Sequence, residues 1–297
     1  MKHSKYSLWK LGFNLLFLIA VTSLVDARPS LHLNFEDHKI GDEYLPSMDQ
    51  IAVEWTNGFG EGRVFIDAAP QSTETDGTHN RKALRVEYPA GGVGPGETGA
   101  QMPVILAAGY EYYLRYDVMF GEDFTWGGTR VAGKLPGLAS RGLCSGGSEC
   151  TGRNGFTARY TWNDDPDGLA TLYLYHMDKS RVYGDHHSLG FVFQPGRWHT
   201  IIQRVRINDS SGGVVEANGE VETWIDGQAL QHLTGLRFVT DGSFLDRFYF
   251  STFVGGGTSA YALPEDGTIW FDNIIVSTDP TDVFEQPSLS PITKHLA

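Results

Sequence analysis

The stretch FTARYTWNDDPDGLATLYLYH, residues 156–176, decides the fold class of this chain. It holds two runs of alternating side chains, separated by a cluster of Asn, Asp, Pro and Gly. Such runs predict β-strands. Side chains two apart on a strand share a face. The predicted core faces carry the apolar residues Phe156, Ala158, Tyr160 and Trp162, then Leu172 and Leu174.

The opposite faces of these two strands carry polar groups that could act on a substrate. Thr157 and Arg159 project from the first strand, and Tyr173 and Tyr175 from the second. Taken singly, such tyrosines are ordinary strand residues. Their joint placement after Lys134, a glycine-flanked lysine with no obvious role in folding, favours an open groove with a functional site.

The same alternation recurs outward from this stretch. Val, Ile, Tyr, Phe and Trp alternate with polar residues, as half-buried strands require, in the segments 83–88, 110–120, 198–207, 220–227, 248–254 and 268–276. No segment shows a long period of 3.6 residues. Many short strands with turn residues between them predict an all-β sandwich or jelly roll, formed as a single domain over residues 28–277.

The two ends of the chain lack the alternating pattern of the predicted strands. Residues 1–10 carry three lysines, residues 11–25 are almost wholly apolar, and Val25-Asp26-Ala27 is a small-x-small cleavage pattern. Residues 1–27 are therefore predicted to be a signal peptide, because the apolar run is too short and poorly flanked for a stable membrane span. Residues 278–297 are rich in Pro, Ser and Asp and are predicted to be a poorly ordered tail.

Charge and cysteines narrow the partners and the compartment. The net charge of −13 argues against nucleic acid or an anionic membrane as partner. Residues 129–206 nevertheless hold ten Lys and Arg against six Asp and Glu, which suits an enzyme of polyanions. Cys144 and Cys150 lie in one Gly/Ser-rich loop. We expect a disulfide in a secreted protein, since two thiolates alone leave zinc half-ligated.

Several motifs, taken together and in order, resemble known families. PGRWHTI (195–201), EVETWIDG (220–227), IWFDNIIV (269–276) and the early LNFED (33–37) resemble strands of concanavalin-like jelly rolls. GKLPGL (133–138), the Cys-containing loop, the Thr-x-Arg strand, YLY (173–175) and FYFSTFVGGG (248–257) resemble polysaccharide lyase family 14 over roughly residues 85–277. That resemblance implies a concanavalin-like jelly roll that acts on alginate or glucuronan.

The resemblance also implies the catalytic residues. The family's lysine falls on Lys134, its arginine on Arg159 and its Tyr-x-Tyr pair on Tyr173 and Tyr175, while Thr157 stands where a serine is usual. The chemistry fits β-elimination, in which the C5 proton of a uronate leaves and the C4–oxygen bond breaks to give a 4,5-unsaturated end. Cations must neutralise the carboxylate, and one tyrosine is expected to be the base because nearby cations favour its phenolate.

Other residues are candidates for binding. Arg141 and Arg181 could grip carboxylates of neighbouring sugars, and His187, with His186 in the same expected loop, could line a subsite. Glu36 and Asp272 could meet around a structural calcium, but acidic residues more often cap turns. We therefore predict no metal and no required cofactor.

Two other functions stay open at this point. A jelly-roll glycoside hydrolase needs two close carboxylates, and Glu220 and Glu222 could share a face, although the preceding Asn-Gly indicates a hairpin. A non-catalytic carbohydrate-binding domain would explain the fold and the aromatic residues, but not the Lys, Arg and Tyr set. We expect a monomeric secreted lyase of an anionic polysaccharide. The polymer, and which tyrosine is the base, are not determined by the sequence.

Overall fold

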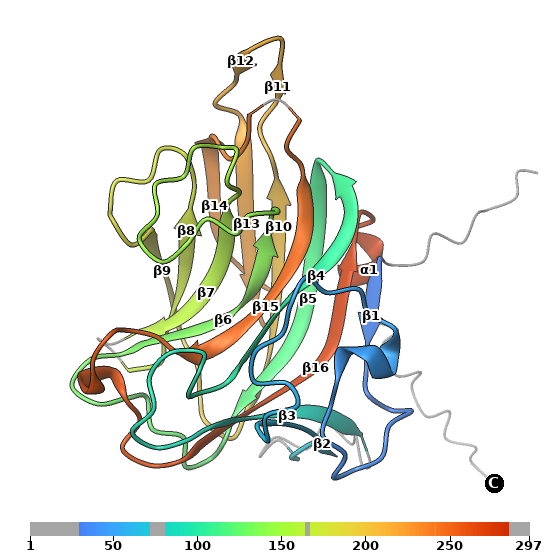
Figure 1. Cartoon of the computed structure of the whole chain (residues 1–297), viewed down its shortest axis with the longest axis vertical. Helices are drawn as coiled ribbons and strands as arrows, with labels where there is room; N and C mark the ends of the chain where they lie inside the picture. The colour runs from blue at the N-terminus through green and yellow to red at the C-terminus, as the bar shows by residue number, and fades with distance from the viewer. Residues whose placement is uncertain (1–29, 72–80, 164–166, 241, 285–297) are drawn as a thin grey trace, which may run out of the picture.

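Two stacked antiparallel sheets build the domain, with a short hairpin projecting from one end (Figure 1). The computed structural model describes residues 30–71, 81–163, 167–240 and 242–284. The predicted all-β jelly-roll sandwich is confirmed.

The eight-stranded sheet has the order β14-β13-β10-β5-β16-β3-β2, and β1 also pairs with β16. Its strands are β1 (Leu31–Leu33), β2 (Val64–Ala68), β3 (Lys82–Tyr88), β5 (Glu111–Phe120), β10 (Trp198–Arg206), β13 (Gly219–Ile225), β14 (Gln228–Leu236) and β16 (Gly267–Ser277). The six-stranded sheet has the order β4-β15-β6-β7-β8-β9. Its strands are β4 (Ala100–Gly109), β6 (Ala132–Ala139), β7 (Thr157–Asn163), β8 (Leu169–Tyr175), β9 (Asp185–Val192) and β15 (Leu245–Val254).

The remaining elements are short. They are the hairpin β11 (Ser210–Ser211) and β12 (Val214–Val215), the 3₁₀ turns η1 (Pro46–Asp49) and η2 (Ser259–Tyr261), and the helix α1 (Thr281–Phe284). All the strand segments predicted from alternation are strands. The predicted Asp-Gly turn joins β13 to β14, with φ of 51° at Asp226 and 76° at Gly227. Two positive φ values in succession are typical of the type I′ hairpin turn.

The core lies between the two sheets and is rich in aromatic rings. Phe120 of β5 contacts Trp162 of β7 at 5.4 Å and Trp126 at 4.8 Å between ring centroids. Burial of these large apolar side chains is the main force that holds the sheets together. Trp126 and Trp162 therefore pack in the interior.

The domain extends past its predicted end at Ser277. Residues 278–284, expected to belong to a poorly ordered tail, instead form a turn and α1. The physical reason is burial: Val283 packs with Ile202 and Ile275 on the outer face of the eight-stranded sheet, and the Phe284 ring lies 5.0 Å from that of Trp224. Residues 285–297 and the predicted signal peptide lie outside the described residues. No helix in the described ranges has the length and apolar character to cross a membrane.

Candidate active site

Three neighbouring strands, β6, β7 and β8, bring the predicted catalytic residues to one face of the six-stranded sheet. Arg159 on β7 lies opposite Tyr173 on β8, and Tyr173 lies opposite His186 on β9. Side chains directly opposite each other in antiparallel strands share a face. The alternate residues of β7 and β8, such as Tyr160 and Leu172, belong to the core as predicted. We call the side of the six-stranded sheet that points away from the core the site face.

Lys134 reaches this group from β6. Its Nζ lies 4.1 Å from the centroid of the Tyr173 ring. The preceding Gly133 is needed because a Cβ there would stand 1.7 Å from an atom of the Trp162 ring. Only 8% of Lys134 is exposed. Burial, and then the charge of Arg159, lower the pKa of Lys134 to about 7. A lysine with this pKa can accept and return a proton near neutral pH.

Arg159 is held by a second group of polar side chains on the same face. Its Nη1 donates to Ser251 Oγ at 3.0 Å, and Gln101 Nε2 donates to Ser251 Oγ at 2.9 Å and to the Tyr249 hydroxyl at 2.6 Å. The guanidinium lies 5.2 Å from the Tyr249 ring and 5.7 Å from the Tyr173 ring. Its buried Nε has no hydrogen-bond partner among the described residues. Such a donor is available for an incoming carboxylate.

The two tyrosines are not equivalent. Their hydroxyls lie 3.1 Å apart, but Tyr175 is fully buried and accepts a hydrogen bond from the Gly147 N–H at 3.0 Å. The Tyr173 ring lies beneath the Lys134 ammonium. Burial and the neighbouring Tyr175 hydroxyl raise the pKa of Tyr173 and outweigh the opposing charge of Arg159. Burial of Tyr173 thus opposes the effect expected from nearby cations, because desolvation disfavours the charged phenolate.

The predicted disulfide between Cys144 and Cys150 is present. Both cysteines pack with Tyr173 and Tyr175 in one buried cluster, so the loop that they close covers the tyrosine pair. Thr157, predicted to bind substrate, is fully buried, and its hydroxyl donates to the Cys144 carbonyl at 3.1 Å. Thr157 therefore supports this loop and is not presented to a substrate.

His187, predicted to line a subsite, lies on the core side of its strand and not on the site face. His186 and His187 were expected in a loop but belong to β9, and His187 lies opposite Leu172, a core residue. His186 is the one on the site face, with its ring 4.6 Å from that of Tyr173. His186 is exposed, but partial desolvation, followed by the charges of Lys134 and Arg181, lowers its pKa to about 4. His186 is therefore a neutral imidazole at physiological pH.

The two arginines predicted to bind carboxylates are exposed at the margins. Arg181 lies in the loop before β9, where its charge acts on His186. Arg141 follows the end of β6, and its backbone N–H donates to Asp246 at 2.8 Å. Arg181 is thus beside the site, and Arg141 lies beyond the strand that carries Lys134.

A residue of the other sheet supports the strand that carries Lys134. The pairing of β6 with β7 shifts register between Leu135 and Leu138. Gln203 on β10 crosses the core to this irregularity. Its Oε1 accepts from the Leu138 N–H and its Nε2 donates to the Ala158 carbonyl, both at 2.9 Å. A fully buried glutamine thus satisfies two backbone groups beside the site strands.

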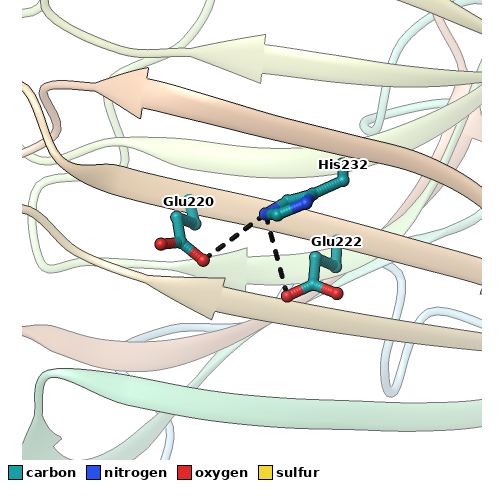
Figure 2. Close-up of side chains that lie close together, drawn as sticks. All are labelled: Glu220, Glu222 and His232. Atoms are coloured by element: carbon teal, nitrogen blue, oxygen red, sulfur yellow. Dashed lines mark ion pairs between the residues drawn. The ribbon is translucent and has the colours of Figure 1, made fainter.

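The acidic pair considered for a hydrolase lies elsewhere. Figure 2 shows Glu220 and Glu222 with His232, whose Nε2 is 3.5 Å and 3.9 Å from the two carboxylates. They lie on the outer face of the eight-stranded sheet, since the alternate residue Val221 is core. Arg204 Nη1 donates to both glutamates. Although the three side chains are close enough to hold a metal ion, Arg204 already pairs with both carboxylates and Arg206 lies 4.0 Å from Glu220. We therefore interpret the group as an ion-pair network.

The residues considered for calcium have other partners. Glu36 accepts from the Lys82 backbone N–H at 3.0 Å, and the Lys82 ammonium donates to the carbonyls of Glu36 and His38. Asp272 pairs with Arg81. An ammonium group therefore occupies the place among carbonyl oxygens that a hard cation would take, and these residues do not fit a calcium ion.

Comparisons with known proteins bear on the family and the fold of this chain. The family model described as polysaccharide lyase 14 matches residues 76–274. The alginate lyase Aly36B has a similar structure, with a TM-score of 0.68 and 22% identity over 84% of this chain and 98% of that one. A mutant of Aly36B has been solved with an alginate tetrasaccharide.

Two further structures show the same fold. The alginate lyase of Aplysia kurodai gives a TM-score of 0.67 and 24% identity, covering 85% of this chain and 100% of that one. Alginate lyase vAL-1 from Chlorella virus gives 0.56 and 16%, covering 76% and 99%. No curated protein matches the sequence.

Proposed function

This chain belongs to the polysaccharide lyase 14 family, and we propose that it cleaves a polyuronate, alginate or glucuronan, by β-elimination on the site face. One observation carries the proposal: a permanently charged guanidinium (Arg159) and an amine that can be neutral near pH 7 (Lys134) both lie against the same phenol ring (Tyr173). Lys134 Nζ lies 4.1 Å and the Arg159 guanidinium 5.7 Å from the centroid of the Tyr173 ring. A carbohydrate-binding domain has no need of a buried lysine with a pKa near 7.

Arg159 is proposed to hold the uronate carboxylate. Its unpartnered buried Nε offers a donor, and a guanidinium remains charged at every relevant pH. Neutralising the carboxylate makes the C5 proton easier to remove, because negative charge develops on the same oxygens as the C5–H bond breaks. The hydrogen bond from Arg159 to Ser251 fixes the guanidinium before the substrate arrives.

Lys134 is proposed to take the C5 proton. At a pKa of about 7 a large fraction of the amine is neutral at physiological pH, whereas the Tyr173 phenol is not ionised there. The electrons of the broken C5–H bond form the C4–C5 double bond, and the C4–oxygen bond breaks. Tyr173 then donates its proton to the leaving oxygen. The Lys134 ammonium, which lies against the Tyr173 ring, can return a proton to the phenolate and restore the site.

The compartment is proposed on two observations. The disulfide between Cys144 and Cys150 is stable in an oxidising environment, and residues 1–27 have the charged, apolar and small-x-small pattern of a signal peptide. We therefore propose that the enzyme is secreted and acts on extracellular polyuronate.

The test is a substrate panel of polymannuronate, polyguluronate and glucuronan with the wild-type protein and the variants Tyr173→Phe and Tyr175→Phe. Ultraviolet absorbance of the conjugated 4,5-unsaturated uronate reports elimination. We expect absorbance with at least one polymer, a loss of about 10²- to 10⁴-fold in Tyr173→Phe, and a smaller loss in Tyr175→Phe. Absorbance that survives fully in Tyr173→Phe would remove Tyr173 from the mechanism. No absorbance with any polymer would refute the proposed substrate class.

A further inference from the structure

A short segment extends the six-stranded sheet beyond its edge strand β4. Val53 and Asn57 form isolated bridges with Val104 and Gln101 of β4. The Glu54 N–H donates to the Pro103 carbonyl at 3.0 Å. The segment 53–57 therefore lies along the edge nearest to Gln101, one of the residues that hold the arginine of the site.

This segment presents Trp55 to solvent. Trp55 is 41% exposed, and it alone among the tryptophans of the described ranges is exposed. Its indole meets the Tyr249 ring edge-on, with centroids 6.1 Å apart and planes at 79°. In an edge-on contact the two rings do not stack face to face. A broad ring face therefore stays available for stacking with another flat group.

Trp55 continues the line of side chains that crosses the site face. Tyr249 lies opposite Pro103 on one side and Gly137 on the other. Gly137 has no side chain, so the Tyr249 ring and the Arg159 guanidinium meet across β6 at 5.2 Å. From Trp55 the line therefore runs through Tyr249 and Arg159 to Tyr173. A polymer lying across the strands would meet Trp55 within a few sugars of the cleaved bond.

The charged groups next to Trp55 are already paired with one another. Glu54 pairs with the buried Arg247, which also pairs with Asp246. This anchors the segment 53–57, and Arg247 is not available to grip a uronate carboxylate. The Trp55 end of the line therefore offers an apolar ring surface, in contrast to the cationic centre at Arg159.

We propose that Trp55 is the platform of a sugar-binding subsite on the β4 side of the active site, where its indole stacks on the C–H face of a uronate ring. This inference rests on the proposed function. It adds that affinity for the substrate depends on whether the oligosaccharide is long enough to reach Trp55. Aromatic rings hold sugars by burying apolar C–H surface, so the contact depends little on salt. Binding at Arg159, by contrast, weakens as salt screens the charges.

The experiment compares Trp55→Ala and Trp55→Phe with Tyr110→Ala on uronate oligosaccharides of increasing length. Tyr110 is a matched control, since it is an exposed aromatic residue that contacts Phe244 instead of the site. We expect Trp55→Ala to raise KM roughly 2- to 10-fold on long oligosaccharides, with kcat unchanged. The shortest cleaved oligosaccharide should be unaffected, and Trp55→Phe should keep most of the affinity.

Calorimetric binding of the same oligosaccharides separates this inference from the proposed function, because binding does not require cleavage. If the wild type gives no unsaturated product, the proposed function fails, while a length-dependent loss of binding in Trp55→Ala still supports the subsite. If Trp55→Ala behaves like Tyr110→Ala at every length, or loses activity equally at every length, the subsite is refuted.

Discussion

Replacing Gln203 by leucine removes the hydrogen bonds that tie the site strands to the opposite sheet. Leucine has a similar volume and fits the same buried place on β10. It cannot accept from the Leu138 N–H or donate to the Ala158 carbonyl, however, and both bonds are 2.9 Å long in the native protein. The substitution Gln203→Leu therefore leaves two buried backbone groups without these partners.

The magnitude follows from those two groups. Each buried polar group left unpaired costs about 1–3 kcal/mol, so Gln203→Leu should lower the free energy of unfolding by about 2–6 kcal/mol. Gln228→Leu is the matched control, because Gln228 is exposed on β14 of the same sheet. That change should stay within about 0.5 kcal/mol.

The assay is equilibrium unfolding in urea, read by tryptophan fluorescence, with lyase activity measured well below the transition. Because the register shift of β6 next to Gln203 lies between Lys134 and the end of its strand, activity should also fall in the folded variant. A loss of stability no larger than that of Gln228→Leu would refute the reasoning that Gln203 satisfies the irregular strand.

Two other predictions concern the proton transfer and the loop over the tyrosines. Lys134 must be neutral to act as base, and its pKa is about 7; kcat/KM should therefore rise with pH through about 7, and Lys134→Arg, which stays protonated, should lose about 10²- to 10⁴-fold. A flat pH profile, or an active Lys134→Arg, would assign the base elsewhere. The double substitution Cys144→Ser and Cys150→Ser opens a loop of sequence separation 6, which should cost roughly 2 kcal/mol in unfolding free energy. It should also lower kcat by loosening the Gly147 contact to Tyr175; unchanged kcat would show that the disulfide does not position the tyrosines.

Period-two alternation was enough to predict the faces of β7 and β8. Tyr160 and Leu172 pack in the core, and Arg159 and Tyr173 share the site face, because a strand alternates its side chains whatever its surroundings. His187 shows the limit of this reasoning. Two adjacent histidines point to opposite faces, and only the pairing of β9 with β8 decides which one meets Tyr173.

Some residues affect the site from a distant part of the chain or through their burial. The sequence around them contains no pattern that predicts this role. Gln203 lies on the opposite sheet, and its role depends on an irregularity in β6. Trp55 lies between the predicted opening strand at 33–37 and the alternating segments, and its neighbours Val53 and Asn57 attach it to β4 through isolated bridges. The proposal that Lys134 is the base rests on the burial of Lys134 and Tyr173, because desolvation moves the two pKa values in opposite directions.

The most direct test of the account counts two products of the same reaction. Purified protein is incubated with each polyuronate, and new reducing ends and new C4–C5 double bonds are measured in one sample. β-Elimination predicts one double bond for each reducing end formed, at every time point. Reducing ends without double bonds would mean hydrolysis and would contradict the central claim.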